Sequence, residues 1–117
     1  MATFTKRIPS GSTNGRLVKI VSIATPGTLI HTAVAGVSDI DEIWLWAVNS
    51  DVADRKLTIE WGGVAVPDDL IELTVRAESG LTLIVPGIPL QNGLVVRAFA
   101  AAANVVMVMS FVNRITA

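Results

Sequence analysis

The chain has 117 residues and a mass of 12.4 kDa, which is the size of a single domain. It contains no cysteine, no tyrosine and one histidine, so disulfides, thiolate metal sites and most acid–base chemistry lack their usual side chains. Its nine basic and ten acidic residues give a net charge of −1, and without a basic surplus we expect no nucleic-acid partner. Only 16% of the residues are charged, against about 25% in a typical soluble domain.

The N-terminal sequence contains no targeting segment that we can identify. The basic pair at Lys6 and Arg7 is not followed by an apolar stretch, so we expect no secretory signal. The chain has no run of about 18 apolar residues, and we expect neither a transmembrane helix nor a membrane partner.

Residues 1–15 differ in composition from the rest of the chain. They are rich in Thr, Ser, Gly and basic residues, and they include Pro9 and the pair Asn14-Gly15. We interpret this segment as an extended N-terminal arm outside the core, with a disordered tail as the alternative. Residues 16–117 are then expected to form the folded domain.

From residue 16 onward the chain is predicted to form eight short strands, in which Val, Ile, Thr and Trp are prominent. The expected strands are Arg16–Ala24, Thr28–Val34, Asp41–Asn49, Lys56–Trp61, Leu70–Ala77, Leu81–Val85, Leu94–Ala100 and Val105–Ile115. Turn sequences separate them, among them Thr25-Pro26-Gly27, Ser79-Gly80, Pro86-Gly87 and Asn92-Gly93. This spacing predicts an all-β fold, with an eight-stranded antiparallel β-sandwich of jelly-roll type favoured over a barrel.

Two of the predicted strands are apolar on both faces. In the strand 41–49, three apolar residues point to each side, with Trp44 and Trp46 sharing one of them, and Val105–Ile115 shows the same character. A two-sheet sandwich buries one face of each sheet, so the second apolar face needs another partner. We therefore predict an oligomer interface, with burial under long loops as the alternative. The interface residues would be Trp44, Trp46, Met107, Met109 and Phe111.

The sequence contains no catalytic constellation. His31 lies in a predicted strand, and as a general base it would need a nucleophile and an orienting partner, so we interpret it as a structural or interface histidine. The aspartates cluster at turns, and their spacing matches no calcium loop. We expect no catalytic residues, no cofactor and no metal, and therefore a protein that is not an enzyme.

The paired tryptophans also suggest a different function. Trp44 and Trp46 lie on one face of their strand about 7 Å apart. Flat aromatic side chains stack on sugars, and they are also enriched at protein interfaces. A carbohydrate-binding platform is therefore the alternative to burial of these residues in the core or in an interface.

Segments spread through the chain resemble a known group of proteins. They are Gly11–Arg16, Thr25–Thr28, Ile30–Ala33, Asp41–Leu45, Thr58–Gly63, Asn92-Gly93, Val96–Ala100 and Val112–Ile115. The chain resembles the small virion structural proteins of tailed bacteriophages, of the kind described as head decoration or cement proteins.

This resemblance implies a β-sandwich, often a homotrimer, that lies on the outer capsid surface of the virion and clamps neighbouring copies of the major capsid protein. The protein would be made in the host cytoplasm, and no catalytic residues carry over. The arm would contact the capsid protein as an extended segment through Phe4, Lys6, Arg7 and Ile8. Related sandwiches serve in tails or head fibres, which makes a carbohydrate- or receptor-binding module the alternative.

Overall fold

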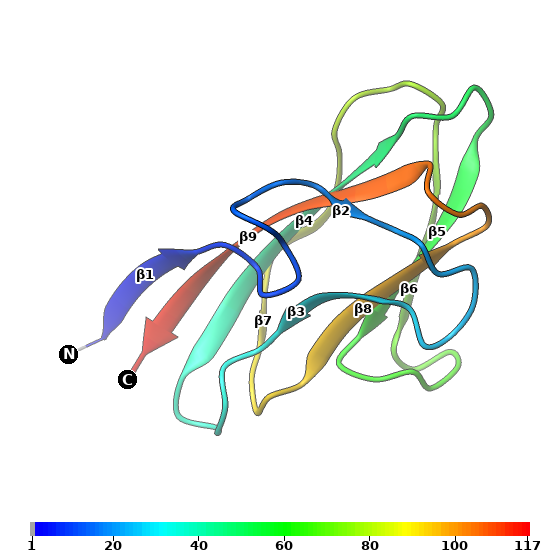
Figure 1. Ribbon diagram of the computed structural model, residues 1–117. Coiled ribbons are helices and arrows are strands. Elements are labelled where there is room, and N and C mark those ends of the chain that lie inside the picture. The colour runs from blue at the N-terminus through cyan, green and yellow to red at the C-terminus, as the bar shows by residue number, and fades with distance from the viewer. Residues whose placement is uncertain (1) are drawn as a thin grey trace.

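The computed structural model describes residues 2–117, and within them it contains nine β-strands and no helix (Figure 1). The all-β prediction is confirmed, and each of the eight predicted strands overlaps an observed one. The strands are β1 (Thr3–Arg7), β2 (Val18–Lys19), β3 (Thr28–Thr32), β4 (Ile40–Asn49), β5 (Arg55–Trp61), β6 (Leu70–Val75), β7 (Thr82–Leu90), β8 (Val95–Ala100) and β9 (Val106–Thr116).

The strands form two antiparallel sheets. The first sheet has the order β1-β9-β4-β7, with β2 also paired to β9, and the second has the order β3-β8-β5-β6. The pairs β2–β9, β3–β8, β4–β7 and β5–β6 join the two halves of the chain in reverse order, as in one long hairpin. The pairs β4–β9 and β5–β8 then fold that hairpin into two sheets.

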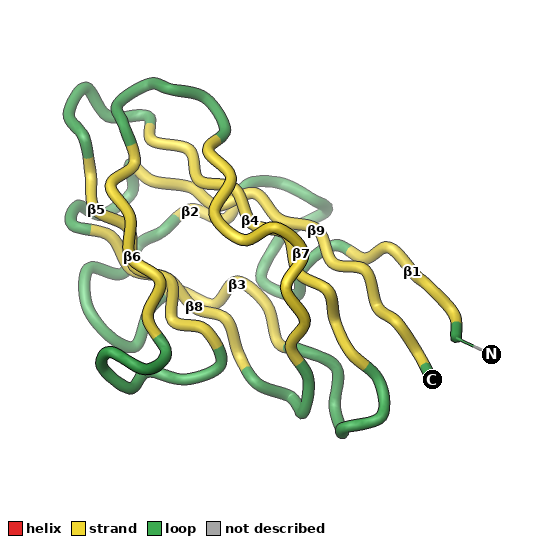
Figure 2. Tube along the Cα trace, turned by 180° about the vertical axis from the view of Figure 1, so that it is seen from behind, coloured by secondary structure: helices red, strands yellow, loops and turns green. Residues whose placement is uncertain are grey.

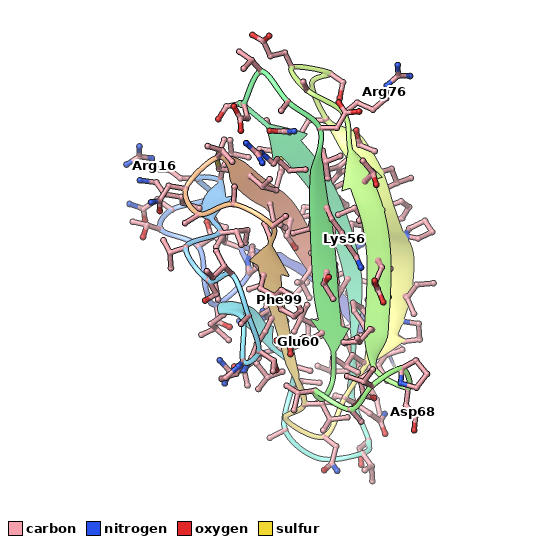
Figure 3. The ribbon with its side chains drawn as sticks, turned by 90° about the vertical axis from the view of Figure 1, so that its right-hand side faces the viewer. Arg16, Lys56, Glu60, Asp68, Arg76 and Phe99 are labelled. Atoms are coloured by element: carbon pink, nitrogen blue, oxygen red, sulfur yellow. The ribbon has the colours of Figure 1, made fainter. Side chains whose placement is uncertain are left out.

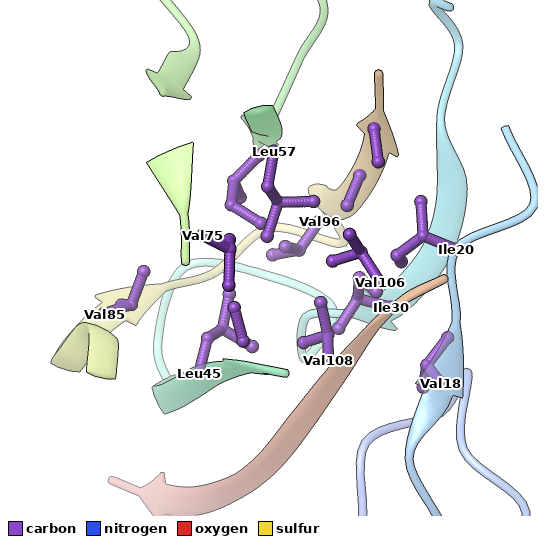
Figure 4. Packing of buried hydrophobic residues seen from close by; sticks show 14 of the residues in the cluster. Val18, Ile20, Ile30, Leu45, Leu57, Val75, Val85, Val96, Val106 and Val108 are labelled. Atoms are coloured by element: carbon purple, nitrogen blue, oxygen red, sulfur yellow. The ribbon is translucent and has the colours of Figure 1, made fainter. Parts of the chain in front are cut away.

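One hydrophobic core lies between the two sheets, as expected for a sandwich (Figure 4). Residues of β4 alternate strictly between buried and half-buried, because successive side chains of a strand point to opposite faces. Leu45 of β4 and Val108 of β9 point into the core from the first sheet, and Leu57 of β5 and Val96 of β8 meet them from the second. These four side chains are fully buried.

A turn predicted at Pro86-Gly87 is instead part of β7, which corrects the expected end of that strand at Val85. Because β7 is the last strand of its sheet, the missing N–H of a proline need not cost a ladder hydrogen bond. The register of the β4–β7 pairing shifts twice, between Ile43 and Trp44 and between Leu45 and Trp46. Such shifts are typical of β-bulges, in which an extra residue on one strand is left unpaired. Gly87 has a φ of 73° and lies against the Trp44 ring, where a Cβ would be 2.8 Å from the ring atoms.

The predicted arm contains a ninth strand that the sequence did not reveal. Residues 3–7 form β1, which pairs with the last residues of β9, so this part of the arm is an edge strand of the first sheet and not a free extension. All five residues of β1 are exposed, which agrees with a position outside the core. The N- and C-terminal strands lie side by side at one end of the elongated molecule (Figures 1 and 2). Met1 of the predicted arm lies outside the described residues.

The outer face of the second sheet is largely polar. Lys56 of β5 forms an ion pair with Glu72 of β6 across this face (Figure 3). The loop after β2 covers part of it, where the Gly27 N–H and the Thr25 hydroxyl donate hydrogen bonds of 2.6 and 2.5 Å to the buried Glu60 carboxylate. This face therefore combines charged and hydroxyl groups with the half-buried ring of Phe99, which lies opposite Thr58, and the loop satisfies the fully buried carboxylate of Glu60.

A large-to-small substitution in the shared core tests the packing of the two sheets. Leu57→Ala should lower the free energy of unfolding by about 2–5 kcal/mol, because the cavity lies between both sheets and cannot collapse freely. Val52→Ala is the control, since Val52 is 85% exposed and its loss should change stability by no more than about 0.5 kcal/mol. Urea denaturation measures both, and equal effects would contradict the burial of Leu57.

Candidate functional site

The outer face of the first sheet carries three aromatic rings in contact with one another. In the β4–β9 ladder, Trp44 lies opposite Phe111 and Trp46 lies opposite Met109. The ring centroids of Trp44, Trp46 and Phe111 are 5.8–6.1 Å apart, and the ring planes differ by 6–23°. Aromatic pairs at this spacing stabilise each other beyond the area that they bury. We call these three residues, together with Met107 and Met109, the aromatic cluster.

The structure brings all five predicted interface residues onto this one face. Met107 lies opposite Val48 in the same ladder, one row beyond Met109 and Trp46. Each member of the aromatic cluster is half-buried within the single chain. The apolar surface continues onto β7, where Leu83 lies opposite Trp46 and is 48% exposed. Phe4 of β1 lies opposite Ile115 on the same face and is 69% exposed, beyond the polar row of Glu42, Asn113 and Lys6.

Two charged residues on this face are engaged with the aromatic cluster. The Lys6 ammonium of β1 lies 4.7 Å from the centre of the Phe111 ring, a cation–π contact. The Glu42 carboxylate accepts hydrogen bonds of 3.1 Å from the Asn113 amide and from the Trp44 indole N–H. These two bonds lower the pKa of Glu42, with Asn113 contributing most. The charges therefore frame the rings without interrupting them.

The residues predicted for the capsid-binding arm divide between two faces. Phe4 and Lys6 lie on the same side of β1 as the aromatic cluster, next to Ile115 and Asn113 of β9. Arg7 lies opposite Val112, whose side chain faces the core, so it points to the other side. Ile8 begins the loop after β1 and is 54% exposed. Part of the predicted arm and the predicted interface thus form one surface, which the sequence did not indicate.

A second group of residues forms a polar cluster at the edge of the core. Asp41 of β4 is fully buried, and its carboxylate accepts hydrogen bonds from His31 of β3 and Arg114 of β9. The distances are 2.8 Å to His31 Nε2 and 2.8 and 2.9 Å to Arg114 Nε and Nη2, and the Val34 N–H donates a further bond of 3.0 Å. On the other side of the imidazole ring, the Ser10 backbone N–H donates to His31 Nδ1 at 3.0 Å.

The hydrogen bonds assign the protonation state of this cluster. Because a backbone N–H can only donate, His31 Nδ1 must carry a lone pair, and the ring proton is on Nε2, facing Asp41. Burial lowers the pKa of His31, and this outweighs the raising effect of Asp41. Burial by itself would raise the pKa of Asp41, but the hydrogen bonds from Arg114 and His31 together hold that pKa below its ordinary value.

The order Ser10–His31–Asp41 has the composition of a catalytic triad but not its geometry. The Ser10 hydroxyl oxygen is 3.4 Å from His31 Nδ1, and it already accepts a 2.7 Å hydrogen bond from the Thr32 N–H. A general base needs a free lone pair for the hydroxyl proton, and here that lone pair accepts the Ser10 backbone N–H. This arrangement supports the interpretation of His31 as a structural histidine, which connects a loop to two strands.

Within residues 2–117, no three side chains of the metal-binding types come together in a way that could hold an ion. Over the same residues, no helix has the length and apolar character needed to cross a membrane. Comparison with known proteins finds no matching family model, no matching curated protein and no matching solved structure. The aromatic cluster and the polar cluster are therefore the features from which a function is argued.

Removal of the Arg114 side chain tests the polar cluster. Arg114→Ala should lower the free energy of unfolding by about 3–5 kcal/mol at pH 7, because it leaves a fully buried carboxylate without its cation. In the wild type, Asp41 stabilises the fold above its ordinary pKa of 3.8, and this contribution is lost as the pH falls through the lowered folded value.

In the Arg114→Ala variant, the raising effect of burial on the pKa of Asp41 is no longer offset by Arg114, so protonation of Asp41 costs less stability and the acid-induced loss of stability should be smaller than in the wild type. Urea denaturation between pH 3 and pH 8 measures both effects. Arg76→Ala is the control, because Arg76 is exposed in the loop after β6 and its removal should leave the pH profile unchanged. Identical profiles for the two variants would contradict a structural role for the cluster.

Proposed function

We propose that the protein is a non-enzymatic structural component of a bacteriophage virion. In this proposal it assembles as a homo-oligomer, a trimer, binds the outer surface of the capsid and stabilises the lattice of the major capsid protein. The observation that carries the proposal is the apolar outer face of the first sheet, with the aromatic cluster at its centre. The virion assignment rests on the resemblance of the sequence to capsid decoration proteins.

The contrast between the two outer faces supports self-assembly. The second sheet exposes the Lys56–Glu72 ion pair and is partly covered by its own loop, whereas the first sheet exposes rings, thioethers and aliphatic side chains. A contiguous apolar surface on a small domain marks an interaction site, and aromatic residues and methionine are enriched in interface cores. A neighbouring copy of the chain would cover this face. In a trimer the interface is heterologous, so the aromatic cluster of one protomer would pack against a different surface of the next.

The strand connections support the jelly-roll arrangement. A jelly roll consists of two sheets built from eight strands, and the orders β2-β9-β4-β7 and β3-β8-β5-β6 account for eight strands in this way. In this arrangement β1 is an additional strand at the edge. Jelly rolls occur in viral capsid proteins and also in lectins, so the fold is compatible with the proposal without deciding it.

Strand β1 supports a contact with the capsid protein. It pairs with β9 on one side and ends the sheet on the other, so its outer edge can accept an added strand from a partner. Two of the other edges are protected: β7 contains Pro86 and Pro89, and the Ser10 loop is hydrogen-bonded along β3. The edge at β6 carries the charged Glu72. Three such edges in one trimer would bind a capsid with far greater avidity than one.

The alternative function is a carbohydrate- or receptor-binding module of a phage tail or head fibre. The observation that favours it is the half-exposed group of three rings, because aromatic faces are the usual platforms for sugars. In that case the aromatic cluster would remain exposed in solution, and tryptophan fluorescence would respond to added sugar. A monomeric protein with such a response would favour this alternative over the virion proposal.

Native mass is the first test of the proposed assembly. Light scattering over a dilution series should give a stable mass of three chains for the wild type. Met109→Lys places a charge at the centre of the aromatic cluster and should reduce the mass to that of one chain while leaving the far-ultraviolet spectrum unchanged. Thr74→Lys, on the exposed outer face of β6, is the matched control and should remain a trimer. A wild-type monomer at every concentration would contradict the proposal.

Capsid attachment is the second test. The double variant Phe4→Asp and Lys6→Glu should bind capsids that lack the protein with an affinity lower by about tenfold or more, as for the loss of interface hot-spot residues. Arg16→Ala is the control, because Arg16 is exposed in the loop between β1 and β2. Co-sedimentation with purified capsids measures the affinities. Equal saturation by the double variant and the wild type would exclude the Phe4 and Lys6 side chains as capsid contacts.

A further inference from the structure

We propose that Ser10, His31, Asp41 and Arg114 form an acid-sensitive latch, which holds the loop between β1 and β2 against β3 and releases it when His31 binds a proton. Ser10 belongs to the loop, and the other three residues belong to β3, β4 and β9. The inference concerns the behaviour of the chain itself and does not depend on the proposed function.

Three consecutive contacts hold the loop along the outer edge of β3. The Ser10 N–H donates to His31 Nδ1 at 3.0 Å, and the Thr32 N–H donates to the Ser10 hydroxyl at 2.7 Å. The Gly11 N–H donates to the Ile30 carbonyl at 2.8 Å. Gly11 also packs so closely that a Cβ at this position would be 2.4 Å from the Leu29 carbonyl oxygen. The loop therefore satisfies edge groups of β3 that would otherwise be unpaired.

Protonation of His31 acts on one side of the ring only. The added proton would lie on Nδ1 and point at the Ser10 N–H, so that two donors face each other at 3.0 Å. On the opposite side, Nε2–H already donates to Asp41, and that bond becomes stronger when the ring is charged. The Ser10 hydroxyl has a second lone pair besides the one that accepts from Thr32, but at 3.4 Å it would accept only a long bond from the new proton, and a shift of the loop would shorten that bond.

Burial and the neighbouring charges together set the upper pH limit of this event. Asp41 of β4 and Arg114 of β9 are the charged groups that act on His31, and Asp39 acts in turn on Arg114. The residue opposite His31 in β8 is the apolar Val96. Burial and Arg114 lower the pKa of His31 below its ordinary value of 6.5, so release occurs below pH 6.5. Asp41 remains ionised in this range because its pKa is lowered from 3.8.

Release would expose an edge that is covered at neutral pH. The Ile30 carbonyl and the Thr32 N–H lose their partners in the loop, and the edge of β3 becomes open. Strand β1 has its own ladder with β9 and stays in place. The latch therefore controls one sheet edge without opening the core.

Amide hydrogen exchange on the full chain tests the latch. The protection of the Ser10, Gly11 and Thr32 amides is measured by nuclear magnetic resonance between pH 7.5 and pH 5, with correction for intrinsic exchange. It should fall about tenfold per pH unit as the pH approaches the midpoint of His31, since opening is linked to the uptake of one proton. The amide of Val108, in the core of β9, is the internal reference and should remain protected.

Two variants separate the latch from a general effect of acid. In His31→Asn, the amide oxygen can accept the Ser10 N–H without titrating, so the pH dependence should disappear. Ser10→Ala keeps the backbone donor and loses the hydroxyl, so Thr32 should be less protected at every pH while the pH dependence remains.

The proposal is overturned by any of three results. One is constant protection of Ser10 and Gly11 while the His31 ring resonances titrate. Another is a parallel loss of protection at Val108, which would indicate global unfolding. The third is an unchanged pH profile in His31→Asn; should that variant not fold, the comparison of loop and core amides in the wild type decides.

Discussion

The antiparallel ladder between β4 and β9 is the contact on which the rest of the structure depends. It runs over all ten residues of β4 and holds the two strands at the centre of the first sheet. Its inward residues, among them Leu45 and Val108, supply six of the sixteen residues of the core cluster. The same ladder brings Trp44 next to Phe111 on the outer face and Asp41 next to Arg114 at one end. A slip of one residue would exchange the two faces and separate both clusters at once.

The two faces of this ladder are the basis of the proposed assembly. The inner face is covered by the second sheet, and the outer face is nearly as apolar but has no covering layer within residues 2–117. The chain places its few charges elsewhere, on the second sheet and in loops, or uses them around the rings, as with Lys6 on Phe111. Removing rings and thioethers from water in an assembly is favourable, whereas in an isolated chain this apolar surface stays exposed to water.

Local sequence signals predicted most of the fold and little of the polar cluster. β-branched runs and turn residues located the strands from 16 onward, because those signals lie within a few neighbouring residues. Strand β1 was missed because its exposed residues show no core-facing pattern and its partners are residues 112–116. The aromatic cluster followed from a strand apolar on both faces, whereas the meeting of Ser10, His31 and Arg114 depends on pairings between distant segments. Single polar residues carry no periodicity, so only the topology brings them together.

The N-terminal segment contributes both to the apolar outer face of the first sheet and to the covered edge of β3. A folded-over hairpin leaves sheet edges at its ends, and an exposed edge is a template for pairing with another chain. Residues 3–7 extend the first sheet and present one such edge, while the Ser10 loop immediately after them covers the edge of β3. The segment thus exposes the edge of β1 and protects the edge of β3. Different interactions hold β1 and the Ser10 loop in place. β1 depends on ladder hydrogen bonds, which are insensitive to pH, whereas the loop depends on a neutral imidazole. Acid can therefore open the second edge while leaving the first unchanged.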